Sequence, residues 1–106
     1  AGTVDVSDEQ AVIYATADVV SSMGRIDSCF ANAGGGFGAP SFIEMTTETW
    51  RKNMAVNLEG AFWTLRESVK HMTERAKAGD PGGSVVGVAS LAGIEGAARN
   101  RVRAVR

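Results

Sequence analysis

Two short apolar runs, residues 26–31 and 84–89, alternate along the chain with segments whose apolar residues recur every three or four positions. Short runs bounded by turn residues are typical of buried strands, and the longer spacing is typical of amphipathic helices. The second run is apolar almost throughout, as parallel strands covered on both faces are. The pattern therefore predicts an α/β chain with about two strands and flanking helices.

The segment before the first strand predicts a helix. Its apolar residues at helical spacing are Ala11, Val12, Ala15, Val19 and Val20. Ser7, followed three positions later by Gln10, is a capping-box pattern, so we expect Ser7 to cap this helix and Gly24 to end it. Residues 3–6 are expected to be the last residues of an earlier strand.

The segment between the two runs predicts a long helix from residue 47 to about residue 77, with Thr46 as its N-cap. Large apolar residues line one face of this helix, and we interpret all of them as core packing. They are Trp50, Met54, Leu58, Phe62, Leu65, Val69 and Met72. Asn57 falls beside this stripe, where a polar amide needs a partner. It is therefore either a satisfied core or kink-forming residue, or a functional residue presented where the helix deforms.

The loop after the first strand is rich in glycine. Gly34, Gly36 and Ala39 fit the spacing of a dinucleotide-binding fingerprint, but that fingerprint must open a helix directly, and here the helix begins only after Thr46. We therefore interpret the segment as a flexible glycine loop. Asn32 stands just before it, at the strand end where open α/β sheets place their ligands.

Strand, long helix and strand together predict a βαβ crossover with parallel strands. The C-terminal ends of both strands then lie at one edge of the sheet. We expect this arrangement to bring Asn32, Ser90 and Asn57 together.

Composition indicates one small domain, since the chain has 106 residues. The net charge of −1 excludes the basic footprint of a nucleic-acid-binding protein, and no apolar run reaches the length of a membrane span. The single cysteine, Cys29, cannot form an internal disulfide, which favours a reducing compartment such as the cytoplasm. We interpret Cys29 as a buried strand residue and His71 as a surface residue. The arginine-rich residues 98–106 predict a solvated or disordered end.

Five motifs follow the order and spacing found in short-chain dehydrogenases/reductases, and the chain resembles the middle of a member of that family. They are Asp5-Val6, Asn32-Ala33-Gly34, Val56-Asn57-Leu58-Glu59-Gly60, Gly83-Ser84-Val85-Val86 and Ser90-Leu91-Ala92-Gly93. The resemblance implies a partial Rossmann-like doubly wound parallel sheet, forming a single partial domain over residues 1–106. It also implies an NAD(P)-dependent oxidoreductase, with NAD or NADP as cofactor and a small carbonyl or alcohol as substrate. A cytoplasmic homo-oligomer that binds neither nucleic acid nor membrane is expected.

The resemblance also implies roles for individual residues. Asp5, Val6, Asn32, Ala33 and Gly34 would line the cofactor site, with Asp5-Val6 contacting the adenine. Ser90 would hydrogen-bond the substrate oxygen, and Asn57 would position a water in a proton relay. No residue is assigned to a metal.

Two parts of the family pattern are missing. The glycine-rich cofactor loop belongs to a strand and helix that would precede Ala1, and the chain does not begin with Met, so we expect a piece of something longer. The Tyr-x-x-x-Lys pair should begin thirteen positions after Ser90, where Arg103 stands. A guanidinium does not deprotonate in proteins, and Tyr14 on the first helix cannot substitute for the missing tyrosine. The isolated chain is therefore expected to be inactive.

Two other hypotheses remain open. The loss of the family pattern after residue 100 favours a truncated or frame-shifted remnant that no longer catalyses a reaction. The other hypothesis is an assembly or binding module. The strand that normally pairs with residues 26–31 is not found in this sequence, and an open sheet edge invites association. So few strands bury a limited core, and we expect exposed apolar surface with self-association or partial disorder.

Overall fold

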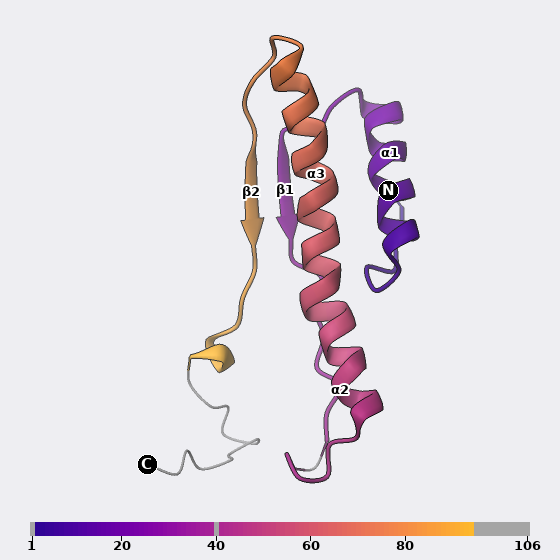
Figure 1. The fold of residues 1–106 in the computed structure, drawn as a ribbon, viewed down its shortest axis with the longest axis vertical. Coiled ribbons are helices and arrows are strands. Elements are labelled where there is room, and N and C mark those ends of the chain that lie inside the picture. The colour runs from indigo at the N-terminus through magenta and orange to yellow at the C-terminus, as the bar shows by residue number, and fades with distance from the viewer. Residues whose placement is uncertain (1, 40, 95–106) are drawn as a thin grey trace.

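The computed structural model describes residues 2–39 and 41–94, which form a two-stranded sheet with helices along one side (Figure 1). In chain order the elements are α1 (Glu9–Met23), β1 (Ser28–Ala31), α2 (Thr47–Met54), the π-helix η1 (Ala55–Glu59), α3 (Gly60–Lys77), β2 (Ser84–Gly87) and the short 3-10 helix η2 (Leu91–Gly93). α3 packs on both strands, and α1 packs beside α3. The predicted α/β class is confirmed. The predicted tail, residues 98–106, lies outside the described residues.

The two strands form the predicted crossover. β1 pairs with β2 in parallel, with Ser28 opposite Ser84 and Phe30 opposite Val86. Both strands are shorter than the apolar runs, because pairing extends only over residues 28–31 and 84–87. Residues 3–6 were expected to end an earlier strand, but within the described residues they form none. A strand needs a partner for its backbone groups, and the described sheet contains only β1 and β2.

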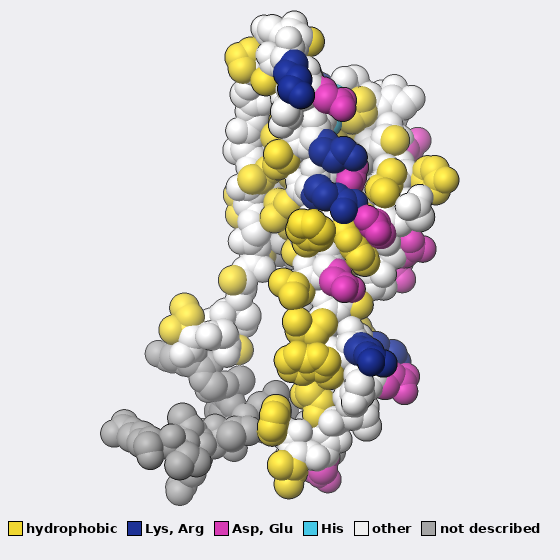
Figure 2. Space-filling view, viewed as in Figure 1, with side chains coloured by type: hydrophobic (Ala, Val, Ile, Leu, Met, Phe, Trp, Pro, Cys, Tyr) yellow, Lys and Arg dark blue, Asp and Glu magenta, His cyan; other side chains and the backbone are white. Residues whose placement is uncertain are grey.

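The prediction that the second strand is covered on both faces is wrong, because every residue of β2 is exposed. α3 lies against one face of the sheet only. On the other face, the register partners Phe30 and Val86 are 68% and 40% exposed. In the described residues the buried apolar side chains are Val12 and Ala31 alone. The expectation of exposed apolar surface is confirmed, and Figure 2 shows such side chains gathered along α2 and α3.

The apolar stripe of α2, η1 and α3 is not the core residue set that its spacing predicts. Trp50, Leu58, Phe62 and Val69 are exposed. The remaining members are half-buried. A helix can bury only the part of its apolar face that meets a neighbouring element, and two short strands cover little of a helix pair this long.

α1 begins one residue later than its sequence pattern suggests. Asp8, not Ser7, is the N-cap, and its carboxylate accepts a hydrogen bond from the Ala11 N–H at 3.1 Å. Ser7 lies one position before this cap, and its N–H and hydroxyl both donate to Asp5 Oδ1. Gly24 ends α1 as predicted, with a φ of 88° that favours glycine. Thr46 caps α2 as predicted.

The long predicted helix is interrupted by one π-helical turn, η1, which separates α2 from α3. Asn57 lies within this turn. The hypothesis that Asn57 occupies a deformed part of the helix is therefore confirmed. Such π-turns are frequent at functional sites.

Two further predictions about single residues are corrected. His71 is half-buried rather than a surface residue, and its Nε2 atom is buried without a hydrogen-bond partner among the described residues. Cys29 is half-buried rather than fully buried. Its Sγ lies 3.9 Å from the Thr64 carbonyl oxygen.

A cluster of two arginines and two aspartates ties the end of α3 to the start of β1. Arg75 is largely buried and donates to the Ile26 carbonyl at 2.8 Å and to Asp80 at 3.1 Å. Arg25 pairs with Asp27 and with Asp80. The hydrogen bond from Arg25 lowers the pKa of Asp27, and the hydrogen bond from Arg75 lowers the pKa of Asp80.

The lowered pKa values of Asp27 and Asp80 predict how the stability of the fold depends on pH. A carboxyl whose pKa is lowered by folding stabilises the folded state above its unfolded pKa, and this contribution is lost as the pH falls through the folded pKa. We expect the urea midpoint of the chain to fall as the pH drops below about 4. The double variant Asp27→Asn/Asp80→Asn should show a shallower fall. Equal acid sensitivity in both proteins would contradict this role for the cluster.

The N-terminal segment packs against the start of α3 at a position where only glycine fits. A Cβ on Gly60 would lie 2.9 Å from both the carbonyl oxygen and Cγ2 of Val6. Backbone atoms cannot move aside without shifting the chain, so this contact sets how closely residues 5–6 approach the helix. We expect Gly60→Ala to lower the free energy of unfolding by about 1–3 kcal/mol, although alanine is the better helix former by about 1 kcal/mol. Gly93→Ala, where the added Cβ meets open space, is the control, and equal unfolding midpoints for the two variants would refute the packing argument.

Candidate functional site

The candidate site lies where both strands end. Because β1 and β2 are parallel, Asn32 after β1 and Ser90 after β2 emerge at the same edge of the sheet. The Val88 N–H donates to the Ala31 carbonyl at 3.1 Å, which holds the two outgoing segments together beyond the strands. The crossover therefore places Asn32 and Ser90 at one edge, as expected from the sequence.

Asn57 joins this edge through the glycine loop. Its Nδ2 donates to the Gly35 carbonyl at 2.7 Å, and its Oδ1 accepts from the Gly35 N–H at 3.0 Å. The same Nδ2 donates to the Asn53 carbonyl at 2.9 Å. A side-chain amide that pairs with both backbone groups of one residue fixes that residue in position and orientation. The loop predicted to be flexible is therefore held against the helix directly after Asn32-Ala33-Gly34.

Sequence reasoning missed a second asparagine that contacts the same loop. Asn53 Nδ2 donates to the Phe37 carbonyl at 2.9 Å, and the Phe37 N–H donates to Asn53 Oδ1 at 3.3 Å. The available signal was the four-residue spacing between Asn53 and Asn57, which places both amides on one face of a helix.

Ser90 is exposed at the N-terminus of η2. Its Oγ accepts a hydrogen bond from the Ala92 N–H at 3.2 Å. The hydroxyl hydrogen can therefore be donated to another group. No hydrogen bond joins Ser90 to Asn57 or to Asn32 in the part of the chain that the structure describes. The three residues share an edge of the sheet, but only Asn57 and the loop after Asn32 are in direct contact.

Asp5 and Val6 lie beside the start of α3. Both the N–H and the hydroxyl of Ser7 donate to Asp5 Oδ1, at 2.9 and 2.6 Å. These hydrogen bonds lower the pKa of Asp5, which is therefore a carboxylate at neutral pH. Because both bonds reach Oδ1, Oδ2 can accept from a ligand. Val6, Asn32 and Ala33 line a hollow beside β1, whereas Asp5 and Gly34 are their chain neighbours and do not line it.

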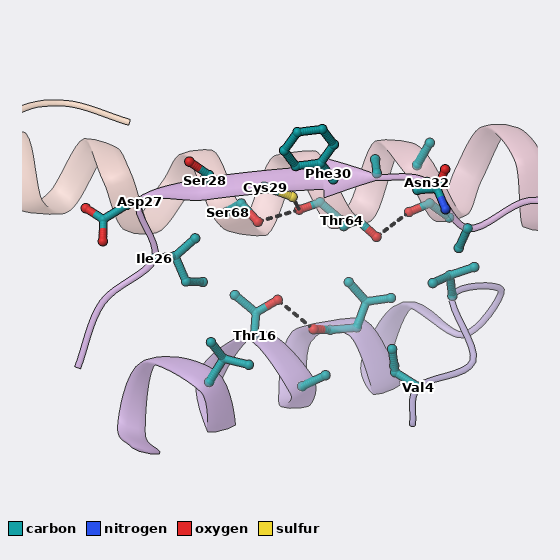
Figure 3. A pocket seen from close by; sticks show the side chains of 18 of the residues that line it. Val4, Thr16, Ile26, Asp27, Ser28, Cys29, Phe30, Asn32, Thr64 and Ser68 are labelled. Carbon is teal, nitrogen blue, oxygen red and sulfur yellow. Dashed lines mark hydrogen bonds between the residues drawn. The ribbon is translucent and has the colours of Figure 1, made fainter. Parts of the chain in front are cut away.

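That hollow has a volume of about 500 Å³ and lies between β1, α1 and α3 (Figure 3). It runs along the edge of β1 that faces away from β2, and the Phe30 ring points away from it. The hydroxyls of Thr16, Thr64 and Ser68 each donate to a carbonyl of their own helix. The walls are otherwise mainly apolar, so most of the hollow suits an apolar chain segment better than a phosphate group.

A family description of short chain dehydrogenases matches residues 1–102. The chain belongs to the short-chain dehydrogenase family. Among similar sequences, an uncharacterized NAD-dependent oxidoreductase of Mycobacterium tuberculosis is 39% identical over 92 residues, covering 87% of this chain and 32% of the relative. The (-)-trans-carveol dehydrogenase of Rhodococcus erythropolis is 34% identical over 97 residues, covering 90% of this chain and 33% of the relative. The chain thus spans about a third of the length of these curated relatives.

Solved structures of this family have the same arrangement of elements. Xylitol dehydrogenase with NAD+ bound superposes with a TM-score of 0.80 at 29% identity, covering 91% of this chain and 35% of the other. ElxO with NADP bound superposes with a TM-score of 0.76 at 27% identity, covering 88% of this chain and 36% of the other. These neighbours are complete Rossmann-type proteins, and the two-stranded sheet described above is a partial form of their fold.

None of the helices in residues 2–39 and 41–94 is long and apolar enough to cross a membrane. His, Cys, Asp and Glu side chains in the same ranges form no group that could hold a metal ion.

The contact between Asn57 and the glycine loop can be tested at Gly34. A Cβ on Gly34 would lie 2.9 Å from Asn57 Oδ1, closer than real Cβ contacts allow. We expect Gly34→Ala to break the Gly35–Asn57 pairing and to raise the hydrogen-exchange rate of the Gly35 amide about tenfold, the loss expected for roughly 1.4 kcal/mol. Gly36→Ala adds a Cβ in open space and is the matched control. Equal exchange rates at Gly35 in both variants would contradict the pairing.

Proposed function

We propose that this chain forms the middle of an NAD(P)-dependent oxidoreductase that transfers hydride between a nicotinamide nucleotide and a small carbonyl or alcohol substrate. The observation that carries the proposal is the pairing of Asn57 with Gly35 at the sheet edge where Ser90 also emerges. Relatives with NAD-dependent activity and structural neighbours with bound NAD+ or NADP support it.

The residues present fit a nicotinamide nucleotide. The carboxylate Oδ2 of Asp5 is a hydrogen-bond acceptor of the kind that an adenine amino group requires. Asn32, Ala33 and Gly34 are exposed at the end of β1. The carboxyl ends of parallel strands are the general ligand-binding edge of this fold class. We assign Asp5, Val6, Asn32, Ala33 and Gly34 to the nucleotide site.

The catalytic assignments concern Ser90 and Asn57. A bound nicotinamide nucleotide would supply or accept the hydride at the substrate carbon. Ser90 accepts from Ala92 and thus keeps its hydroxyl hydrogen to donate to the substrate oxygen. Asn57 uses both amide hydrogens on the Gly35 and Asn53 carbonyls. Its Oδ1 accepts one hydrogen bond, from the Gly35 N–H, and has a second lone pair. That lone pair would accept a hydrogen bond from a relay water.

Proton transfer to the substrate oxygen needs a further group. Ser90 orients an oxygen but is a poor acid or base at neutral pH, because efficient proton transfer requires a pKa near the working pH. Arg103, at the position expected for the acid/base tyrosine, lies outside the described residues, and a guanidinium does not deprotonate. We therefore propose that the 106-residue chain by itself does not complete the reaction.

The purified chain should show no sustained oxidation of NADH or NADPH when it is mixed with a panel of aldehydes and ketones. The measurement is the absorbance of the reduced nucleotide, which falls when that nucleotide is oxidised. Turnover above the rate given by a Ser90→Ala variant would contradict this expectation.

Sequencing the coding DNA on both sides of this segment separates the remaining hypotheses. An in-frame glycine-rich loop upstream and Tyr-x-x-x-Lys downstream would support the oxidoreductase, whereas a start codon before Ala1 and a stop codon after Arg106 would support a non-catalytic remnant.

An assembly module is the second candidate, and a specific observation favours it. The edge of β1 that faces away from β2 borders an apolar hollow. On the helices that follow β1, Trp50, Leu58 and Phe62 are more than half exposed. Open strand edges and apolar patches promote association. We expect size-exclusion chromatography of the chain to give a concentration-dependent shift to larger species. A sharp monomer peak at high concentration would count against this candidate.

A further inference from the structure

Asn53 and Asn57 contact the glycine loop in the same way, one helical turn apart. Each Nδ2 donates to a loop carbonyl and to the carbonyl four residues earlier in its own helix. Each Oδ1 accepts from the N–H of the loop residue whose carbonyl is paired with the Nδ2 of the same side chain. The partners are Phe37 for Asn53 and Gly35 for Asn57. The two side chains together form a pair of equivalent rungs, which we call the amide ladder.

The spacing of the two partners explains why the rungs fit together. Four residues along a helix rise about 6 Å, and two residues of near-extended chain span about 6.6 Å. Asn53 and Asn57 are four apart, and Gly35 and Phe37 are two apart. The loop can therefore run alongside the helix in the opposite direction and meet both amides without a bend. A shift of the loop by one residue would leave both amides facing the wrong backbone groups.

A single rung would not hold this loop in one orientation. Residues 34–38 contain four glycines, and glycine loses more conformational freedom on ordering than any other residue. With Gly35 alone fixed, the chain on either side of it could still rotate about the pairing. The second rung, two residues on, removes that rotation and sets the direction in which the preceding residues leave β1.

We propose that Asn53 is a positioning residue that acts with Asn57 to fix the glycine loop, and through it the segment Asn32-Ala33-Gly34, in the geometry that receives the nicotinamide nucleotide. The proposal rests on the proposed function for the identity of the ligand. The ladder itself does not depend on that identity. Asn53 contacts the backbone of Phe37 and would act on the nucleotide site through it.

Two variants of Asn53 separate this role from a contribution to the helix. Alanine is a better helix former than asparagine, so Asn53→Ala removes the rung without weakening α2. Aspartate has the same size and keeps the acceptor oxygen, but it lacks both donor hydrogens and places a carboxylate next to the carbonyls of Phe37 and Thr49. A role limited to filling space would survive Asn53→Asp. Lys52→Ala, at the neighbouring exposed position, is the matched control.

The experiment is amide hydrogen exchange followed by NMR on the 106-residue chain. In the unsubstituted chain the Gly35 and Phe37 amides should be protected. Both Asn53 variants should lower the protection factor of Phe37 by about threefold to tenfold, the range given by one net hydrogen bond, and should move the amide resonances of Asn32 and Gly34. Lys52→Ala should change neither. Unchanged protection at Phe37, or lost protection with unmoved Asn32 and Gly34 resonances, would overturn the proposal.

A parallel titration with NADH keeps the two proposals distinguishable. If NADH shifts the Asn32 and Gly34 resonances of the unsubstituted chain, both Asn53 variants should weaken that binding, and equal affinity in all three proteins would overturn the positioning role. If NADH shifts no resonance of the unsubstituted chain, nucleotide binding by this chain is refuted. The ladder is then judged by the exchange data alone.

Discussion

The parallel pairing of β1 with β2 is the constraint on which the rest of the structure depends. Two parallel strands cannot be joined by a tight turn, so the chain must return along its length through a crossover. Here α2, η1 and α3 form that return, and α3 packs on both strands. The same constraint brings the ends of both strands to one edge. Every candidate catalytic or nucleotide-contacting residue is positioned by this edge or by the helix that passes it.

The narrowness of the sheet explains the surface of the molecule. Within residues 2–39 and 41–94, helices cover one face of two short strands, and β1 has a neighbouring strand on one edge only. Phe30 on the open face and about half of the apolar stripe along α2, η1 and α3 are consequently exposed. The hollow beside β1 has the same origin. The chain spans about a third of the length of its curated relatives, and its described residues contain two strands of the family fold.

The loop after β1 shows how a flexible sequence is fixed by a rigid one. Glycines allow the backbone to pass close to the helix at Gly34, but they provide no side chains to hold it there. The asparagine amides supply both a donor and an acceptor to each paired residue and so replace the contacts that a neighbouring strand would make. The regular helix is interrupted by η1 at the same place. The Nδ2 atoms of Asn53 and Asn57 donate to carbonyls of the helix as well as of the loop, so the same two side chains join both segments.

The sequence by itself determined what depends on local chemistry. The strand–helix–strand order and the caps Gly24 and Thr46 follow from spacing and turn residues, which act over one or two helical turns. The deformation at Asn57 was one of the readings that the sequence left open, and the structure decided it. Whether an apolar position is buried was decided only in three dimensions, because burial depends on which elements lie opposite it. Trp50 and Val86 therefore read as core residues in the sequence yet lie exposed. The spacing of Asn53 and Asn57 placed both amides on one helix face, but the partner of Asn53 was decided by the tertiary structure, since the contact joins residues 16 positions apart through backbone atoms that every residue possesses.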